Sequence, residues 1–141
     1  MKTAGYSGTP LYKKLGIKAG DRAWFSGNPE GYEFELQKAG EFQLAPKLTP
    51  NLDFVHVFTT SRSDLNRNFP ELKSALKPSG MVWISWPKKS SGVKTDLDEN
   101  IVRELGLKTG LVDVKVCAID DVWSGLKFVF RLKDRMILAA F

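Results

Sequence analysis

The sequence predicts a single α/β domain in three layers, with a mostly parallel β-sheet that lies between helices and ends in an antiparallel hairpin. Residues 53–58 and 81–86 are predominantly apolar runs, which are typical of parallel strands buried on both faces. A helical pattern follows each run, as in βαβ units. From Val112 to Leu132, apolar residues alternate with polar ones on either side of a turn, which indicates two antiparallel strands.

A short helix is the first predicted element. Thr9 can cap it, Pro10 suits its first position, and Gly16 can close it. The preceding stretch 5–8 is too rich in glycine to be a regular element. We expect Tyr6 to pack back on the domain and to fix this helix.

Two short strands and a helix come next. Residues 22–26 form a strand that ends in the turn 27–31, a helix covers about 31–38, and 42–45 forms the second strand. The segment 46–52 is too short to hold a helix and another strand, so the sheet is abbreviated after its second strand.

The following helix has one apolar face, formed by Leu65, Phe69, Leu72 and Leu76. Pro70 lies inside this helix and is expected to kink or split it. The turn 77–80 then leads into the strand 81–86. One more helix, capped by Thr95 or Asp96, precedes the hairpin and buries Leu97, Ile101 and Leu105.

The domain is expected to span residues 1–132 and to be followed by an apolar tail, 133–141. The tail contains Met136, Ile137, Leu138 and Phe141 and has no turn signal. Soluble monomers rarely expose such a cluster. We therefore expect the tail to pack on its own sheet, to add to a sheet edge, or to meet a second subunit in a homodimer.

Composition excludes several classes of protein and site. One cysteine and one histidine in 141 residues exclude an internal disulfide and a Cys/His zinc cluster. No apolar run approaches the roughly 18 residues of a membrane span, and the start lacks a secretory h-region, so we expect a cytoplasmic protein without membrane contact. The net charge of +5 is spread along the chain, which argues against nucleic acid as a partner.

The order of elements resembles a known fold. The sequence LKPSGMVWI at 76–84 is similar to the turn and strand after the fourth helix of class I S-adenosylmethionine-dependent methyltransferases. The helix 96–108 and the hairpin 111–132 are similar to the last helix and the reversed final strand of that fold. The resemblance covers residues 20–132 and implies a Rossmann-like, methyltransferase-like fold.

Longer strings resemble a bacterial family known as domain of unknown function 3052. They are AGYSGTPL at 4–11, WPKK at 86–89 followed by Ser91 and Gly92, VDVKVC at 112–117, and WSGLK at 123–127. This resemblance reaches to about Lys133. It implies no established activity, so the chemistry has to come from the residues.

Three features of an S-adenosylmethionine site are missing from the sequence. The turn 26–31 after the first strand has two glycines, but Pro29 removes an N–H and fixes φ there. The second strand ends in Ala45 and Pro46, without the carboxylate that would bond the ribose hydroxyls. The segment 46–52 cannot supply the helix and strand that wall the adenine. We therefore expect no bound cofactor.

The best candidate site is the loop that follows the strand 81–86. It leaves the carboxyl end of a central strand, where open α/β sheets bind their ligands. Its lysines and hydroxyls can donate to phosphate or carboxylate, and Trp86 can offer a stacking face or instead pack in the core. The residues expected at this crevice are Gly27, Asn28, Thr59, Thr60, Trp86, Lys88, Lys89 and Ser91.

Other enzyme interpretations are weaker. Cys117 and His56 could form a nucleophile–base pair, but both lie within strand patterns that are typical of core residues. Asp120 and Asp121 lack further ligands at metal-site spacing. The sequence therefore predicts a non-catalytic module that binds a small anionic ligand or a protein partner. An atypical S-adenosylmethionine-dependent methyltransferase is the alternative.

Overall fold

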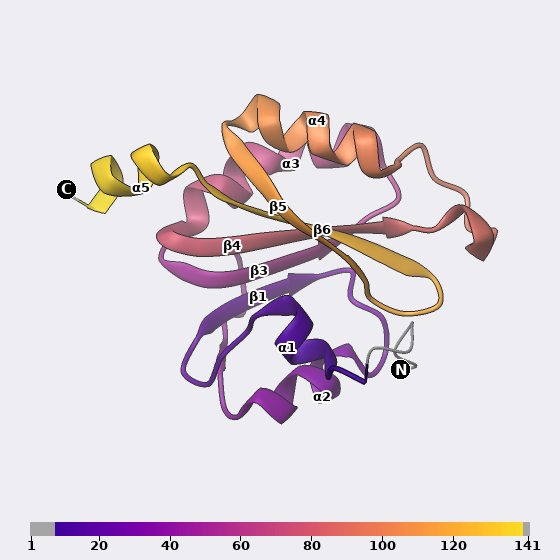
Figure 1. Ribbon diagram of the computed structural model, residues 1–141, viewed down its shortest axis with the longest axis horizontal. Coiled ribbons are helices and arrows are strands. Elements are labelled where there is room, and N and C mark those ends of the chain that lie inside the picture. Colours follow the sequence, from indigo (N-terminus) through magenta and orange to yellow (C-terminus); the bar gives the residue numbers. More distant parts are fainter. Residues whose placement is uncertain (1–7, 140–141) are drawn as a thin grey trace.

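A six-stranded mixed sheet forms the middle layer of the protein in the computed structural model, which describes residues 8–139 (Figure 1). The strands lie in the order β2-β1-β3-β4-β6-β5. The first four are parallel to their neighbours, and β6 is antiparallel to both β4 and β5. This confirms the predicted architecture. The expected packing of Tyr6 lies outside the described residues.

The bounds of the elements agree with most of the predicted ranges. The strands are β1 Arg22–Ser26, β2 Gln43–Leu44, β3 Leu52–Phe58, β4 Leu76–Pro87, β5 Leu111–Ala118 and β6 Trp123–Phe130. The α-helices are α1 Leu11–Leu15, α2 Tyr32–Leu36, α3 Arg62–Ala75, α4 Glu99–Thr109 and α5 Leu132–Ala139. Short 3-10 helices cover Gln37–Ala39 and Lys89–Ser91. No helix among the described residues is both long and apolar enough to cross a bilayer.

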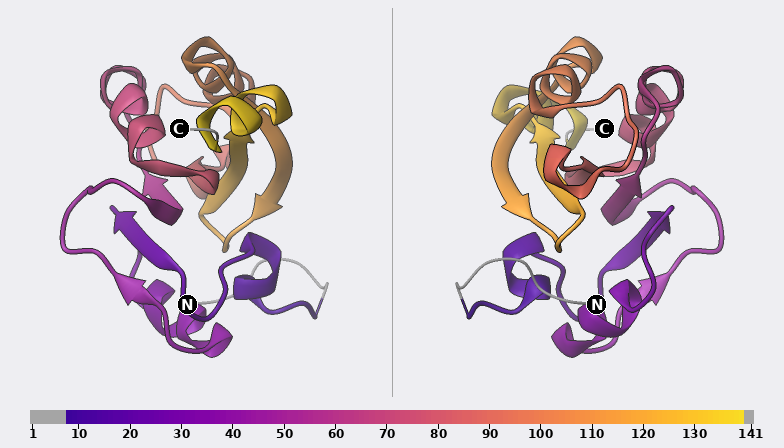
Figure 2. Two further views of the ribbon diagram at one scale, coloured as in Figure 1. Left: turned by 90° about the vertical axis from the view of Figure 1, so that its left-hand side faces the viewer. Right: turned by 90° about the vertical axis from the view of Figure 1, so that its right-hand side faces the viewer.

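Helices cover both faces of the sheet, α3 and α4 on one side and α1 and α2 on the other (Figure 2). Alternate residues of the central strands serve the two layers. Val82 and Ile84 pack toward α3 and α4, whereas Trp83 packs toward α1 and donates its Nε1–H to the carbonyl of Leu15 over 2.9 Å. The apolar runs are continuous because both faces of these strands are buried.

Helix α3 is continuous through Pro70, so the expected split of this helix is wrong. Pro70 is exposed, while Phe69 and Leu72 on either side of it are buried against the sheet. Burial of this apolar face holds the helix together despite the missing N–H. The helix ends at Ala75, and Leu76 already begins β4.

The helix caps differ from the expected ones. Helix α1 begins after Pro10, one residue later than expected, and ends at Gly16 in the left-handed conformation as predicted. Asp98 caps α4, where its carboxylate accepts from the N–H of Ile101 over 2.8 Å. Asp96 instead accepts from the N–H of Arg62 over 2.7 Å, at the start of α3.

Two strand regions are less regular than predicted. Residues 77–80, expected as a turn, are an irregular part of β4, between the pairs Leu52–Leu76 and Phe54–Met81. In the hairpin, the register shifts between Asp113 and Lys115, so that Val114 has no partner on β6. Val114 and Val116 are therefore 53% and 48% exposed, and the predicted alternation does not bury all the valines of β5.

The apolar tail forms helix α5, which extends from the end of β6 beyond the sheet (Figure 1). Its side chains stay exposed, with Leu132 at 69%, Met136 at 70% and Ile137 at 58%. The helix does not cover its apolar residues by packing on the rest of the described chain.

Candidate functional site

The loops that follow β1, β3 and β4 meet at the carboxyl edge of the sheet. Gly27 adopts a φ of +69°, and a Cβ at this position would collide with the carbonyl oxygen of Phe58. The N–H of Thr59 donates to the carbonyl of Ser85 over 3.0 Å. The expected neighbours Gly27 and Thr59 therefore lie on loops that pack against one another.

Thr59 stabilises the start of α3, and Thr60 connects the loop after β3 to the segment before α4. Thr59 accepts at Oγ1 from the N–H of Ser61 over 3.2 Å, and the carbonyl of Thr60 accepts from the hydroxyl of Thr95 over 2.8 Å. Asn28 is partly exposed in the turn after β1. The bonds of Thr59 and Thr60 hold the loops of the carboxyl edge in place. The hydroxyl of Thr60 is exposed and makes no hydrogen bond among the described residues.

The loop after β4 is tied to the hairpin turn. Lys88 donates from Nζ to the carbonyl of Asp120 and from its backbone N–H to Val122, each over 2.7 Å. Ser91 donates from Oγ to the carbonyl of Lys88 over 2.6 Å. Lys89 is exposed and pairs with no carboxylate in the described part of the chain. Lys89 and the remaining N–H groups of Lys88 are thus available for an anion.

Trp86 does not offer the stacking face considered above. Its side chain is only 6% exposed and belongs to the core between the sheet and helices α3 and α4. Residues of β4 alternate between the two layers, and Trp86 has the same orientation as Val82 and Ile84. Its role is packing.

A groove of about 260 Å³ lies beside this edge, between the sheet and α3. Its lining includes Trp24, Ser26 and Val57 of the sheet and Thr59 of the loop after β3, and α3 contributes Asp64 and Asn68 among others. The groove exists because the segment after β2 contains no helix that would cover β1. The shortness of the 46–52 connection in the sequence indicated this groove. Of the residues that line the groove, only Thr59 was among the predicted site residues.

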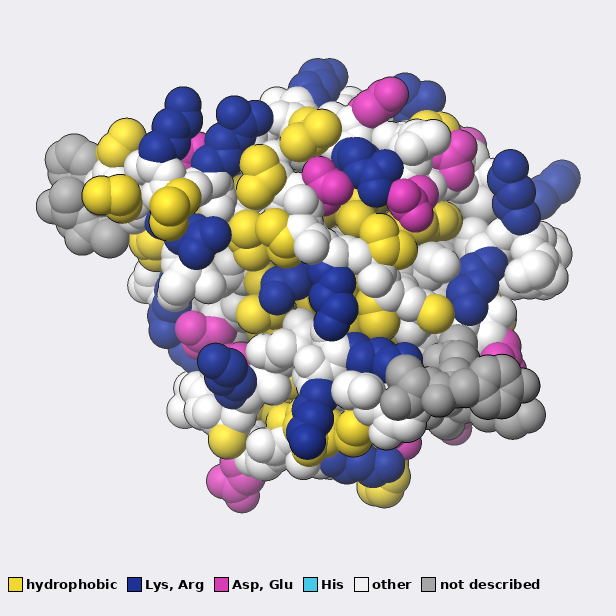
Figure 3. Space-filling view, viewed as in Figure 1, with side chains coloured by type: hydrophobic (Ala, Val, Ile, Leu, Met, Phe, Trp, Pro, Cys, Tyr) yellow, Lys and Arg dark blue, Asp and Glu magenta, His cyan; other side chains and the backbone are white. Residues whose placement is uncertain are grey.

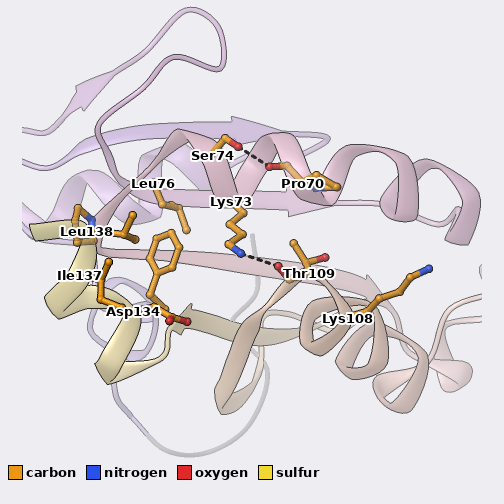
Figure 4. Close-up of a pocket in the computed structure, with 11 residues that line it drawn as sticks. Pro70, Lys73, Ser74, Leu76, Lys108, Thr109, Asp134, Ile137 and Leu138 are labelled. Atoms are coloured by element: carbon orange, nitrogen blue, oxygen red, sulfur yellow. Dashed lines mark hydrogen bonds between the residues drawn. The ribbon is translucent and has the colours of Figure 1, made fainter. Parts of the chain in front are cut away.

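A second hollow, of about 870 Å³, lies at the opposite end of α3, where the ends of α4 and α5 and the start of β4 meet (Figure 4). Lys73 donates to the carbonyl of Thr109 across it over 2.8 Å, and Ile137 and Leu138 line it from α5. It depends on the projecting helix for one of its walls.

A buried polar network crosses the layer under α2. Tyr32, His56 and Ser85 are fully buried. The Tyr32 hydroxyl lies 2.5 Å from His56 Nδ1, and Ser85 Oγ lies 2.7 Å from Nε2. Burial lowers the pKa of His56 well below its usual 6.5 and raises the pKa of Tyr32 well above 10.

Neither of the weaker chemical candidates forms a reactive site. Both nitrogens of His56 are engaged by Tyr32 and Ser85, and the thiol of Cys117 donates instead to the carbonyl of Ala118 over 3.3 Å. Burial raises the pKa of Cys117, which disfavours its thiolate. A carboxylate oxygen of Asp120 accepts from two backbone N–H groups of its own turn. No cluster of metal ligands occurs within residues 8–139.

The carboxyl edge lacks the carboxylate that is expected of an S-adenosylmethionine site. The position that a Cβ of Gly27 would take faces the carbonyl oxygen of Phe58. Rings of Tyr32, Phe58 and Trp123 pack edge to face beside it, with centroids 5.1 and 5.3 Å apart. After β2 come Ala45 and Pro46, so no carboxylate stands where the ribose hydroxyls would need one.

The chain matches no family model and no curated protein, whereas many solved structures are similar to it. The resemblance to domain of unknown function 3052 therefore stays a prediction. A methyltransferase from Aquifex aeolicus, described as S-adenosylmethionine-dependent, is 18% identical with a TM-score of 0.64, over 84% of this chain and 86% of that one.

Two further structures have the same arrangement. A protein from Pyrococcus horikoshii is 13% identical with a TM-score of 0.59, over 86% of both chains. A TehB-like methyltransferase from Corynebacterium glutamicum is 10% identical with a TM-score of 0.56, over 91% of both chains. At these identities the similarity is one of fold. The chain has the α/β Rossmann-like fold of the S-adenosylmethionine-dependent methyltransferases.

Proposed function

We propose that the chain is a non-catalytic binding module built on a methyltransferase-like fold. One observation carries this proposal: no carboxylate follows β2, where the ribose hydroxyls of a cofactor would need one. Gly27 packs on Phe58, and Ala45 and Pro46 stand where a carboxylate is needed. A protein that keeps the fold without these features can still act by binding a ligand or a partner on its surface.

The ligand of this module is a small anion or an acidic group of a protein partner, bound at the carboxyl edge. Lys89 is exposed, and Lys88 has N–H donors beyond the one that bonds Asp120. Exposed loops held on a rigid sheet are a common place for such recognition. The residues proposed here are Gly27, Asn28, Thr59, Thr60, Lys88, Lys89 and Ser91.

Thermal unfolding in phosphate tests this site. Phosphate at constant ionic strength should raise the Tm of the wild type more than chloride does, because binding to the folded state stabilises it. The double substitution Lys88→Ala/Lys89→Ala should reduce that gain, whereas Lys94→Ala, at an exposed lysine of the same loop, should leave it in place. An equal gain in all three proteins would refute the site.

An atypical methyltransferase is the second candidate, favoured by the shared fold and by the groove beside Trp24 and Thr59 at the exits of β1 and β3. Calorimetric titration with S-adenosylmethionine and S-adenosylhomocysteine separates the two. We expect no saturable heat. Micromolar binding of either compound would overturn the proposal of a non-catalytic module.

A second copy of the chain is the proposed partner of helix α5. Leu132, Met136 and Ile137 are exposed together on this helix, and such a cluster is stabilised when it is buried against another surface. The hollow beside Ile137 and Leu138 adds concave area to the same surface. Association through α5 would make a homodimer.

A further inference from the structure

The register of the hairpin places two lysines directly opposite each other. Lys115 of β5 pairs with Lys127 of β6, and Lys127 in turn pairs with Trp83 of β4. Paired residues of neighbouring strands point to the same face, so both lysines lie on the side of the sheet that carries α1. Side chains in such pairs have their Cβ atoms about 5 Å apart, and like charges there are destabilising.

The two ammonium groups have unequal surroundings. Lys115 is exposed and donates from Nζ to the carbonyl of Lys14 at the end of α1, over 2.8 Å. Lys127 is partly buried beside Gly16, where its Nζ would lie 3.7 Å from an added Cβ. Among the described residues, Nζ of Lys127 has no hydrogen bond or ion pair. A half-buried charge without a partner requires an explanation.

A third lysine strengthens the positive field. Burial and the charges of Lys115 and Lys18 together lower the pKa of Lys127, so these three groups lie within electrostatic reach of one another. The carboxylate of Asp21 accepts from the backbone N–H of Lys18 over 2.9 Å. The ion pairs of the described residues involve other cations, namely Lys38, Arg67, Lys77 and Arg103.

We call Lys18, Lys115 and Lys127 the lysine face. The space-filling view shows dark-blue side chains gathered across the middle of this side of the molecule, between the hairpin and α1, with acidic side chains around them rather than among them (Figure 3). The three lysines come from distant parts of the chain. Their juxtaposition is a product of the fold and does not show in the even distribution of charge along the sequence.

We propose that the lysine face binds the terminal phosphate group of a small phosphorylated molecule. A phosphate monoester carries nearly two negative charges near neutral pH and presents three acceptor oxygens. It can therefore accept from Lys115 and Lys127 at once and neutralise the repulsion between them. A carboxylate carries one negative charge and two acceptor oxygens, so it neutralises the positive charges of the lysine face less completely. The proposal does not rest on the carboxyl-edge site, because its residues belong to β5, β6 and the segment after α1.

Thermal unfolding in low salt, with and without inorganic phosphate, tests the lysine face. The variant Lys127→Met keeps most of the aliphatic stem and removes the charge. Without phosphate it should melt at a higher temperature than the wild type, because the cross-strand repulsion is gone. With phosphate at constant ionic strength, the wild type should gain more stability than Lys127→Met, which should retain only the part of the gain that belongs to the carboxyl edge. Affinity for phosphate should fall about tenfold or more in the variant.

Matched variants separate this site from the one at the carboxyl edge. Lys88→Ala/Lys89→Ala and the control Lys94→Met should each retain the part of the phosphate gain that belongs to the lysine face. Amide shifts in two-dimensional NMR should move at Gly16, Lys115 and Lys127 during the phosphate titration. This readout does not depend on how stable a variant is.

Three results would overturn the proposal. The first is a full phosphate gain in Lys127→Met, and the second is the absence of NMR shifts on β5 and β6. The third is tighter binding of an oligonucleotide than of phosphate, with a steep salt dependence, since this would assign the lysines to a phosphodiester backbone.

Discussion

Lowering the pH from about 7 to about 5.5 should destabilise the protein through one residue. His56 is the single histidine of the chain, so the interpretation is not confused by a second one. It is fully buried between Tyr32 and Ser85, and burial lowers its pKa well below 6.5. In the neutral ring one nitrogen donates and the other accepts, so both hydroxyls are paired whichever tautomer is present.

The sign and size of the effect follow from proton linkage. Below about pH 6.5 the unfolded chain binds a proton at His56 and the folded protein does not, so stability falls as the pH falls. Between about pH 7 and pH 5.5 this amounts to about 1.3 kcal/mol for a group with an unfolded pKa of about 6.5. Burial raises the pKa of Asp21 from its usual 3.8, which has the opposite sign but acts mainly at lower pH.

Urea denaturation at the two pH values measures this loss. The wild type should lose about 1.3 kcal/mol, and Tyr32→Phe should show a similar loss from a lower starting stability, because it keeps the buried imidazole. His56→Gln should be less stable at neutral pH but nearly insensitive to this pH change. A wild type of constant stability, or a His56→Gln variant that keeps the full loss, would refute the reasoning.

Three further outcomes are expected. Gly106→Ala in α4 should cost about 1–3 kcal/mol in urea denaturation despite the better helix propensity of alanine, because a Cβ there would overlap the ring of Phe128. Asp98→Ala should cost about 1 kcal/mol in the same assay through loss of the cap on Ile101. Truncation after Lys133 should convert a dimer into a folded monomer in light scattering. An unfolded product would indicate packing within one chain, and a stable, unchanged monomer would contradict both roles of the tail.

The layers of the fold could be predicted because they depend on local patterns. Buried central strands need apolar residues on both faces, and this requirement is visible at 53–58 and 81–86 without knowledge of the partners. Helix interiors were equally readable from Leu65, Phe69 and Leu72. Helix caps were harder to predict, because Asp96 and Asp98 are both residue types that cap helices well. Asp96 bonds the N–H of Arg62 instead because the start of α3 lies beside it in the fold.

The site was harder to predict because it depends on register and orientation. The side chain of Trp86 had to face one helical layer or the other. The run 81–86 is predominantly apolar on both faces of the strand, so the sequence did not decide between them. The bulge at Val114 shifts the phase of β5 and puts Lys115 opposite Lys127, which no pattern within one strand reveals. Contacts between two strands depend on their register, and the sequence of one strand does not contain this information.

The position of β6 in the sheet has a consequence for biosynthesis. This strand lies between β4 and β5, yet it is translated after both. Until Trp123–Phe130 leaves the ribosome, β5 has no neighbour in the sheet, and β4 presents the bare edge that contains Val82 and Ile84. Such an edge is a template for pairing between nascent chains. A longer delay between the emergence of β4 and that of β6 should therefore lower the yield of native protein.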